Sequence, residues 1–107
     1  MDLADKEALK ATVGEADIVV DATRVGMGDL ADQSNLEQEW MRPGQMIVDT
    51  TYIPVITELL RRAEAAGATP ITGLTMLVAQ GALGEKIWFG VDMPIDDVKR
   101  DVFKDLK

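Results

Sequence analysis

Two short runs of consecutive apolar residues restrict the fold of this chain more than any other feature of its sequence. Residues 17–23 and 45–51 are each centred on apolar, mostly β-branched side chains, with no alternation of polar and apolar positions. Such runs are typical of strands that are covered on both faces in a parallel sheet. A third run, residues 68–72, contains Pro70, which lacks a backbone N–H and therefore predicts a strand at the edge of the sheet.

Helical patterns separate these expected strands. Each pattern shows apolar residues at helical spacing, and most have a capping or stop signal at one end. The expected helices lie between the cap Asp5 and the stop Gly14, from the capping-box residue Ser34 to about Met41, from Ile56 to Ala63 before Gly67, from Met76 to Phe89, and from Ile95 to Phe103 after Pro94. Because strands and helices alternate, the sequence predicts parallel β-α-β units with right-handed crossovers.

The predicted fold class is α/β, the second half of a Rossmann-like doubly wound domain with about three parallel strands, flanking helices and C-terminal helices. A complete domain of this kind has about six strands and a glycine-rich turn after the first strand. The 107 residues contain three strand signals and no G-x-G-x-x-G motif. We therefore expect residues 1–107 to form a single unit, the C-terminal half of a dinucleotide-binding domain.

Charge and composition exclude several classes of function. With 11 basic and 19 acidic residues, the net charge of -8 disfavours binding to nucleic acid and to anionic membranes. The chain has no run of ~18 apolar residues and no secretion signal, which predicts a cytoplasmic protein. Cysteine and histidine are absent, so we predict no disulfide and no metal site. Carboxylates, lysines and Tyr52 remain as the candidates for proton transfer.

Gln80 is the only polar side chain on the apolar face expected for the helix that begins near Met76. An amide in apolar surroundings must form hydrogen bonds or it costs free energy of folding. Spacing alone leaves two answers open: Gln80 bonds a carbonyl of a neighbouring loop inside the core, or it contacts a ligand. The small residues beside it, Gly81, Ala82 and Gly84, suit the close approach of another backbone or of a ligand.

Three segments of the chain resemble, in this order, motifs of the shikimate and quinate dehydrogenase family. They are Ala16-Asp-Ile-Val-Val-Asp-Ala-Thr-Arg-Val-Gly-Met27, Val48-Asp-Thr-Thr-Tyr-Ile-Pro-Val-Ile-Thr-Glu-Leu-Leu60 and Gly73-Leu-Thr-Met-Leu-Val-Ala-Gln-Gly-Ala82. Trp88-Phe-Gly90 before Pro94 is similar to the family's closing segment. The resemblance implies the C-terminal part of the NADP-binding domain of a shikimate 5-dehydrogenase. Such an oxidoreductase of aromatic amino acid biosynthesis reversibly reduces 3-dehydroshikimate to shikimate.

The resemblance also implies which residues form the site. The cofactor-binding residues would be Ala22, Thr23, Val25, Gly26, Met27, Thr50, Gly73 and Met76. The substrate-binding residues would be Tyr52 and Gln80, with Gln80 hydrogen-bonded to a ring hydroxyl of shikimate. Thr23 and Thr50 follow predicted strands, beyond whose carboxyl ends the ligands of open α/β sheets bind. From the residues alone, a turn after a buried strand explains the glycines equally well, core packing explains Met76, and a hydrogen-bonded phenol at a domain edge explains Tyr52.

Four positions depart from the family's usual pattern. Ile53 and Glu58 replace a frequent Asn and a frequent Pro, which affects loop rigidity more than chemistry. Thr75 replaces a common glycine and could shift the nicotinamide end of the cofactor. Arg24 stands where a small or apolar residue is usual, and it is either a solvated surface arginine or a partner for a nucleotide phosphate.

The family's catalytic lysine and aspartate, its N-terminal substrate domain, its glycine-rich loop and its NADP-selecting segment have no counterpart in these residues. We therefore assign no catalytic residue and expect the 107-residue chain to be an inactive fragment that binds NADP, with NAD as the alternative cofactor. An unpaired sheet edge and an apolar helix face predict a homodimer or pairing with a missing N-terminal half. Two other functions stay open: a catalytically silent α/β binding or regulatory module, and a dehydrogenase of quinate or another hydroxy acid.

Overall fold

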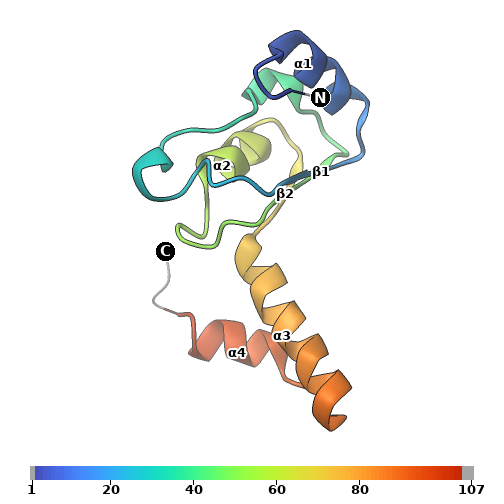
Figure 1. Cartoon of the computed structure of the whole chain (residues 1–107), viewed down its shortest axis with the longest axis vertical. Helices are drawn as coiled ribbons and strands as arrows, with labels where there is room; N and C mark the ends of the chain where they lie inside the picture. The colour runs from blue at the N-terminus through green and yellow to red at the C-terminus, as the bar shows by residue number, and fades with distance from the viewer. Residues whose placement is uncertain (1, 105–107) are drawn as a thin grey trace.

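A three-stranded parallel sheet forms the centre of the computed structural model, which describes residues 2–104 (Figure 1). The strands are β1 (Ile18–Asp21), β2 (Met46–Asp49) and β3 (Thr69–Ile71), in the spatial order β1-β2-β3. The helices are α1 (Lys6–Glu15), α2 (Glu58–Ala65), α3 (Gly73–Phe89) and α4 (Ile95–Asp101), with the 3-10 helices η1 (Gly28–Leu30) and η2 (Gln38–Trp40). The predicted α/β class with parallel strands is confirmed, and β3 with Pro70 lies at an edge.

Side-chain caps set the starts of three helices. Asp5 accepts a hydrogen bond from the Ala8 backbone N at the start of α1, as the sequence predicts. Thr57 caps α2, so that helix begins at Glu58 and Ile56 lies outside it, exposed. Thr72 caps α3, which therefore begins three residues before Met76. The strength of these local signals explains why helix positions can be read from the sequence to within a few residues.

The predicted helix from Ser34 to Met41 is wrong. The Ser34 hydroxyl accepts from the Leu36 backbone N at 3.1 Å and donates to the Leu36 carbonyl at 2.9 Å, so this side chain closes a local turn and caps no helix. Only η2 forms, because Leu36 and Met41 on either side of it are buried in the core and hold the segment against α1 and α2.

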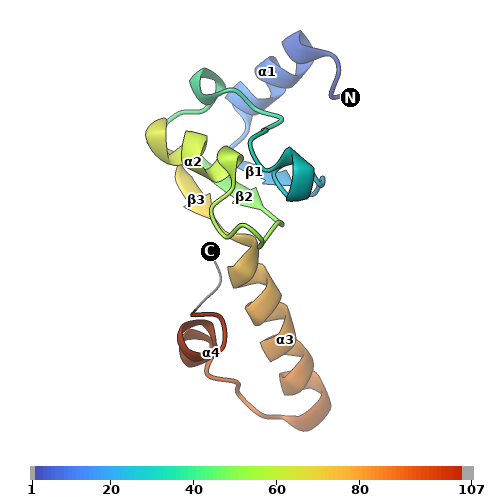
Figure 2. The ribbon, with the colours of Figure 1, turned by 90° about the vertical axis from the view of Figure 1, so that its left-hand side faces the viewer.

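One face of the sheet carries the hydrophobic core. Val19 of β1 and Ile47 of β2 are paired in register and point to the same side. The helices α1 and α2 cover that side, as Figure 2 shows for α2 beside β2 and β3. The buried core residues from these helices are Leu9, Val13, Leu59, Leu60 and Ala63.

The opposite face of the sheet is uncovered in residues 2–104. Ile18 and Val20 are 61% and 58% exposed, and Met46, paired with Ile18, is exposed as well. The prediction that both faces are covered is therefore wrong for this chain. The strands have the composition of a doubly covered sheet, but α1 and α2 both lie on the Ile47 side.

The helices α3 and α4 pack against each other and extend away from the sheet, which gives the molecule its elongated shape of 47 × 26 × 25 Å (Figure 1). The far end of α3 is exposed, including the large side chains of Leu83, Ile87 and Trp88. Within residues 2–104, no helix combines the length and the hydropathy that crossing a membrane requires.

Candidate functional site

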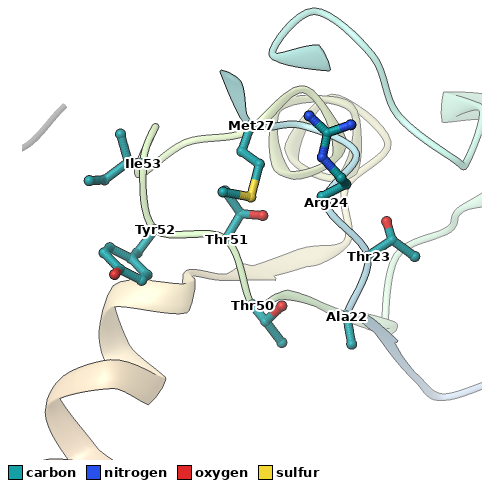
Figure 3. Close-up of a pocket in the computed structure, with 8 residues that line it drawn as sticks. All are labelled: Ala22, Thr23, Arg24, Met27, Thr50, Thr51, Tyr52 and Ile53. Carbon is teal, nitrogen blue, oxygen red and sulfur yellow. The ribbon is translucent and has the colours of Figure 1, made fainter. Parts of the chain in front are cut away.

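A pocket of about 350 Å³ lies at the carboxyl ends of β1 and β2 (Figure 3). Two loops form it: the first follows β1 and the second follows β2, whose last residues Asp21 and Asp49 are paired in register. The residues that line the pocket are Ala22, Thr23, Arg24 and Met27 of the first loop and Thr50, Thr51, Tyr52 and Ile53 of the second. Strands that run parallel bring both loops to one edge of the sheet, so residues about 30 positions apart in sequence meet there.

The first loop is fixed at its base by Thr23. Its backbone N and its hydroxyl both donate to the Asp21 carboxylate, at 2.8 and 2.7 Å, and its hydroxyl accepts from the Val25 backbone N at 3.2 Å. Gly26 follows with φ of +108°, a conformation that residues with a Cβ rarely adopt. The loop then turns so that Met27 faces the pocket (Figure 3).

The second loop is joined to the first strand and to α3. The Thr50 hydroxyl donates to the Asp21 carbonyl at 3.2 Å, which ties the two strand ends together. Gly73, the first residue of α3, lies so close to this loop that an added Cβ would overlap the carbonyl oxygens of Thr50 and Thr51. The start of α3 is therefore packed directly against the second loop of the pocket.

The chemistry of the pocket suits an uncharged ring that carries polar substituents. Ala22, Met27 and Ile53 give it an apolar wall, while threonine hydroxyls and backbone amides offer donors and acceptors. Of the residues that the structure describes, Arg24 is the one charged residue in the lining. Its guanidinium pairs with Asp29 at 2.7 Å, with both side chains more than half exposed. Among residues 2–104, no carboxylate or lysine lines the pocket, so the described lining contains no strong proton acceptor.

The structure brings five of the predicted site residues together in the pocket: Ala22, Thr23, Met27, Thr50 and Tyr52. Val25, Gly26 and Gly73 are not among the lining residues, and Gly26 and Gly73 are buried. Thr51 and Ile53 also line the pocket, and their position on either side of Tyr52 in the motif was the signal that could have identified them.

Met76 and Gln80 lie outside the pocket, one turn apart on α3, and both are exposed. The Gln80 amide donates to the Leu77 carbonyl of its own helix at 2.9 Å. The interpretation of Gln80 as a core amide bonded to a neighbouring loop is therefore wrong. The reason is that α3 extends away from the sheet, so its Gln80 face has no core to enter.

A pocket beyond the carboxyl ends of parallel strands, formed by the loops after them, defines a ligand-binding segment of a doubly wound α/β nucleotide-binding fold. Comparison with known proteins identifies which proteins of this class the chain resembles. Residues 73–102 match the family model of the Shikimate 5'-dehydrogenase C-terminal domain. By sequence and fold the chain is similar to the C-terminal part of shikimate dehydrogenases.

Individual relatives show how much of such proteins the chain represents. It is 43% identical over 106 residues to the NADP(+) shikimate dehydrogenase of Streptococcus uberis, matching 97% of this chain and 36% of that protein. It is 37% identical over 100 residues to the quinate/shikimate dehydrogenase of Shigella flexneri, matching 92% of this chain and 40% of that protein. The crystal structure of Listeria monocytogenes shikimate 5-dehydrogenase with shikimate and NAD superposes with a TM-score of 0.89 at 35% identity, over 96% of this chain and 36% of that one.

The chain therefore spans well under half the length of these relatives, and the prediction of a partial Rossmann-like fold is confirmed.

Proposed function

We propose that the chain supplies the C-terminal half of the NADP-binding domain of a shikimate dehydrogenase, an oxidoreductase that reversibly reduces 3-dehydroshikimate to shikimate. The observation that carries this proposal is the pocket at the ends of β1 and β2, which brings Thr23, Thr50 and Tyr52 together from motifs that the family shares. The activity is assigned to the whole enzyme, since the chain spans well under half the length of its relatives and none of the described residues that line the pocket is a carboxylate or a lysine.

The residues of the pocket fit the nicotinamide end of the cofactor. Ala22, Met27 and the methyl group of Thr50 would form a wall for the ring, and the Thr23 segment would offer polar groups to its carboxamide. Val25, Gly26 and Gly73 would shape this wall from behind, and Met76 would pack at its rim. The cofactor supplies the hydride, and this chain orients the ring that carries it.

The substrate would lie between the pocket and α3. Tyr52 is 40% exposed at the pocket, and Gln80 is exposed on the helix whose first residue packs against the same loop. Within the described residues, the Gln80 amide bonds only its own helix, so its oxygen is available to a ring hydroxyl. These features support the assignment of Tyr52 and Gln80 to substrate binding.

The remaining assignments concern the whole protein. We infer a cytoplasmic enzyme in which residues 1–107 form one half-domain, which pairs with the N-terminal half or with a second copy. The uncovered sheet face with Ile18, Val20 and Met46 supports such pairing. The net charge of -8 argues against nucleic acid and anionic membranes as partners.

Quinate is the second candidate substrate, and NAD the second candidate cofactor. The Shigella flexneri relative is a quinate/shikimate dehydrogenase, and the Listeria monocytogenes structure contains NAD. Because the chain covers only part of these proteins, its residues do not decide between the substrates or between the cofactors.

The test is a calorimetric titration of the 107-residue chain with NADP+, NAD+, shikimate and quinate, with absorbance followed for nicotinamide reduction. We expect a nucleotide to bind without turnover and Met27→Glu to abolish binding, because a carboxylate would be placed in the apolar wall. The control is Met93→Glu, a half-buried methionine before α4 and outside this pocket. Binding of neither nucleotide would contradict the cofactor role, and turnover would contradict the assignment of the proton acceptor to the rest of the enzyme.

A further inference from the structure

Two buried carboxylates lie at the base of the pocket without lining it. Asp21 ends β1 and Asp49 ends β2, the two are paired in register, and they are 8% and 0% exposed. A buried carboxylate costs free energy unless it is paired or hydrogen-bonded. Within residues 2–104 neither forms an ion pair with Lys or Arg. Their burial therefore depends on neutral hydrogen-bond donors, and those donors come from the two pocket loops.

The Asp21 cluster (Asp21, Thr23 and Asn35) closes the first loop. One oxygen of Asp21 accepts from the backbone N and the hydroxyl of Thr23, and the other accepts from the Asn35 amide at 3.1 Å. The same amide donates to the Thr23 hydroxyl at 3.0 Å. Thr23 begins the loop and Asn35 lies 12 residues further on, so one carboxylate joins both ends.

The Asp49 cluster (Asp49, Thr51 and Thr57) closes the second loop in the same way. One oxygen of Asp49 accepts from the Thr51 backbone N at 3.0 Å, and the other accepts from the Thr57 hydroxyl at 2.7 Å. Thr57 also caps α2, so the far end of the loop is fixed to a helix whose packing residues are buried. Hydrogen bonds to an ionised acceptor are about twice as strong as those between neutral groups.

The two loops also meet through the Asp49 cluster. A Cβ built on Gly26 of the first loop would lie 3.5 Å from the Thr57 Cβ and 3.8 Å from the Asp49 Oδ2. The buried backbone of Gly26 therefore packs against this cluster. The cluster contacts the turn of the first loop and fixes both ends of the second loop. All the described pocket-lining residues lie between Asp21 and Asn35 or between Asp49 and Thr57.

We propose that Asp21 and Asp49 are positioning residues, which hold the two loops in the arrangement that forms the pocket while their own side chains stay out of it. The choice of NADP+ as the ligand depends on the proposed function, whereas the role of the two carboxylates in holding the loops does not. Loss of Asp21 loosens the first loop, and loss of Asp49 loosens the second loop and the Gly26 turn of the first. The energetic cost appears in ligand affinity as well as in local protection of the loop amides.

The test compares Asp21→Ala and Asp49→Ala with Asp21→Asn and Asp49→Asn in the full chain. Asparagine retains one carbonyl oxygen for the Thr23 or Thr51 amide, so it should rescue most of the effect. Asp17→Ala is the matched control, because Asp17 precedes β1 but its side chain is 94% exposed. Two readouts are measured: hydrogen exchange of the Thr23, Thr51 and Ile47 amides, and the Kd for NADP+.

We expect Asp49→Ala to speed exchange of Thr51 by about 10-fold or more, with Ile47 in β2 little changed, and to raise the Kd by about 10-fold. Asp21→Ala should act likewise on Thr23. The asparagine variants should stay within about 3-fold of the native chain, and Asp17→Ala should change neither readout.

If an alanine variant does not fold, Thr57→Val and Asn35→Ala remove the far-end donor of each cluster and leave the carboxylate in place. The same local acceleration is expected at Thr51 and Thr23. The proposal would be overturned if hydrogen exchange at Ile47 sped up as much as at the loop amides, or if exchange at the loop amides did not speed up. It would also be overturned if the asparagine variants changed exchange and Kd as much as the alanine variants do. Failure of the native chain to bind NADP+ would count against the proposed function, while the exchange data would still decide the role of the two aspartates.

Discussion

At the scale of single residues, the closest approach in the site is that of Gly73 to the second loop. An alanine there would drive its Cβ into the carbonyl oxygens of Thr50 and Thr51, and backbone atoms cannot move aside as a flexible side chain can. We expect Gly73→Ala to lower the free energy of unfolding by about 1–3 kcal/mol. The control is Gly81→Ala on the same helix, which meets no atom within 4 Å and should stabilise by about 0.5–1 kcal/mol. Urea denaturation measures both, and equal effects would contradict the steric argument.

Gln80 gives a residue-scale prediction about the whole enzyme. If its exposed amide binds a ring hydroxyl, Gln80→Ala removes one partner from a buried polar contact, which costs about 1–3 kcal/mol. The KM for shikimate should therefore rise by about 5-fold or more, with the KM for the cofactor unchanged. Steady-state kinetics separates the two constants. Equal increases in both constants would indicate a folding role instead.

At the scale of one element, α2 carries a charge network in its first turns. Glu58 accepts hydrogen bonds from Arg61 and Arg62, and the bond from Arg61 contributes most to lowering the pKa of the Glu58 carboxyl below its ordinary value. A carboxylate in the first turn also interacts favourably with the helix dipole. The Glu58 charge therefore stabilises α2, the helix that fixes the far end of the second loop.

The sign of the pH dependence follows from that pKa. Because the pKa is lower in the folded state, the stabilisation is present above the ordinary glutamate range and is lost as the pH falls through the folded value. We expect Glu58→Gln to lower the free energy of unfolding by less than about 1 kcal/mol at pH 7 and to have a smaller effect at pH 3. The control is Glu64→Gln, an exposed position on the same helix. If urea denaturation showed that Glu58→Gln lowers the free energy of unfolding equally at both pH values, this explanation would be contradicted.

At the scale of the whole molecule, the uncovered sheet face predicts association. Ile18 and Val20 are adjacent on that face, and burying such side chains contributes about 1.5–3 kcal/mol each. We expect sedimentation velocity to show association that grows with protein concentration, and with salt because salt screens the net charge of -8. The double substitution Ile18→Thr/Val20→Thr should weaken it by about 10-fold or more. Ile56→Thr, an exposed residue outside the sheet, is the control. A native chain that stays monomeric throughout would contradict the prediction.

The sequence-based predictions that the structure confirms depend on local patterns in the chain. The Asp5 cap depends on a contact between residues near in sequence, and the strands are marked by short apolar runs, so both can be recognised without knowing the rest of the fold. The pocket residues Thr23 and Thr50 follow from the strands, because the ends of parallel strands meet at one edge.

Burial could not be predicted in the same way, and the two glutamines show why. Gln80 stands among apolar residues in sequence and is exposed, because α3 leaves the sheet. Gln45, which nothing in its neighbourhood marks as special, is 1% exposed and satisfied: its amide donates to the Val13 and Ala16 carbonyls at 2.7 and 2.9 Å, and its oxygen accepts from the Arg42 backbone N. The Val13 and Ala16 partners lie about 30 positions away along the chain, whereas Arg42 is three positions away.

The three strands and the four α-helices of residues 2–104, and the family resemblance, can be read from the sequence, because caps, strand runs and motifs are local patterns. Only the tertiary structure decided that Ser34 closes a turn instead of starting a helix, that one face of the sheet is bare, and that Asp21 and Asp49 fasten the pocket loops. These outcomes depend on which distant groups come together to bury a side chain or supply its hydrogen bonds, and burial and partnership are properties of the packed molecule.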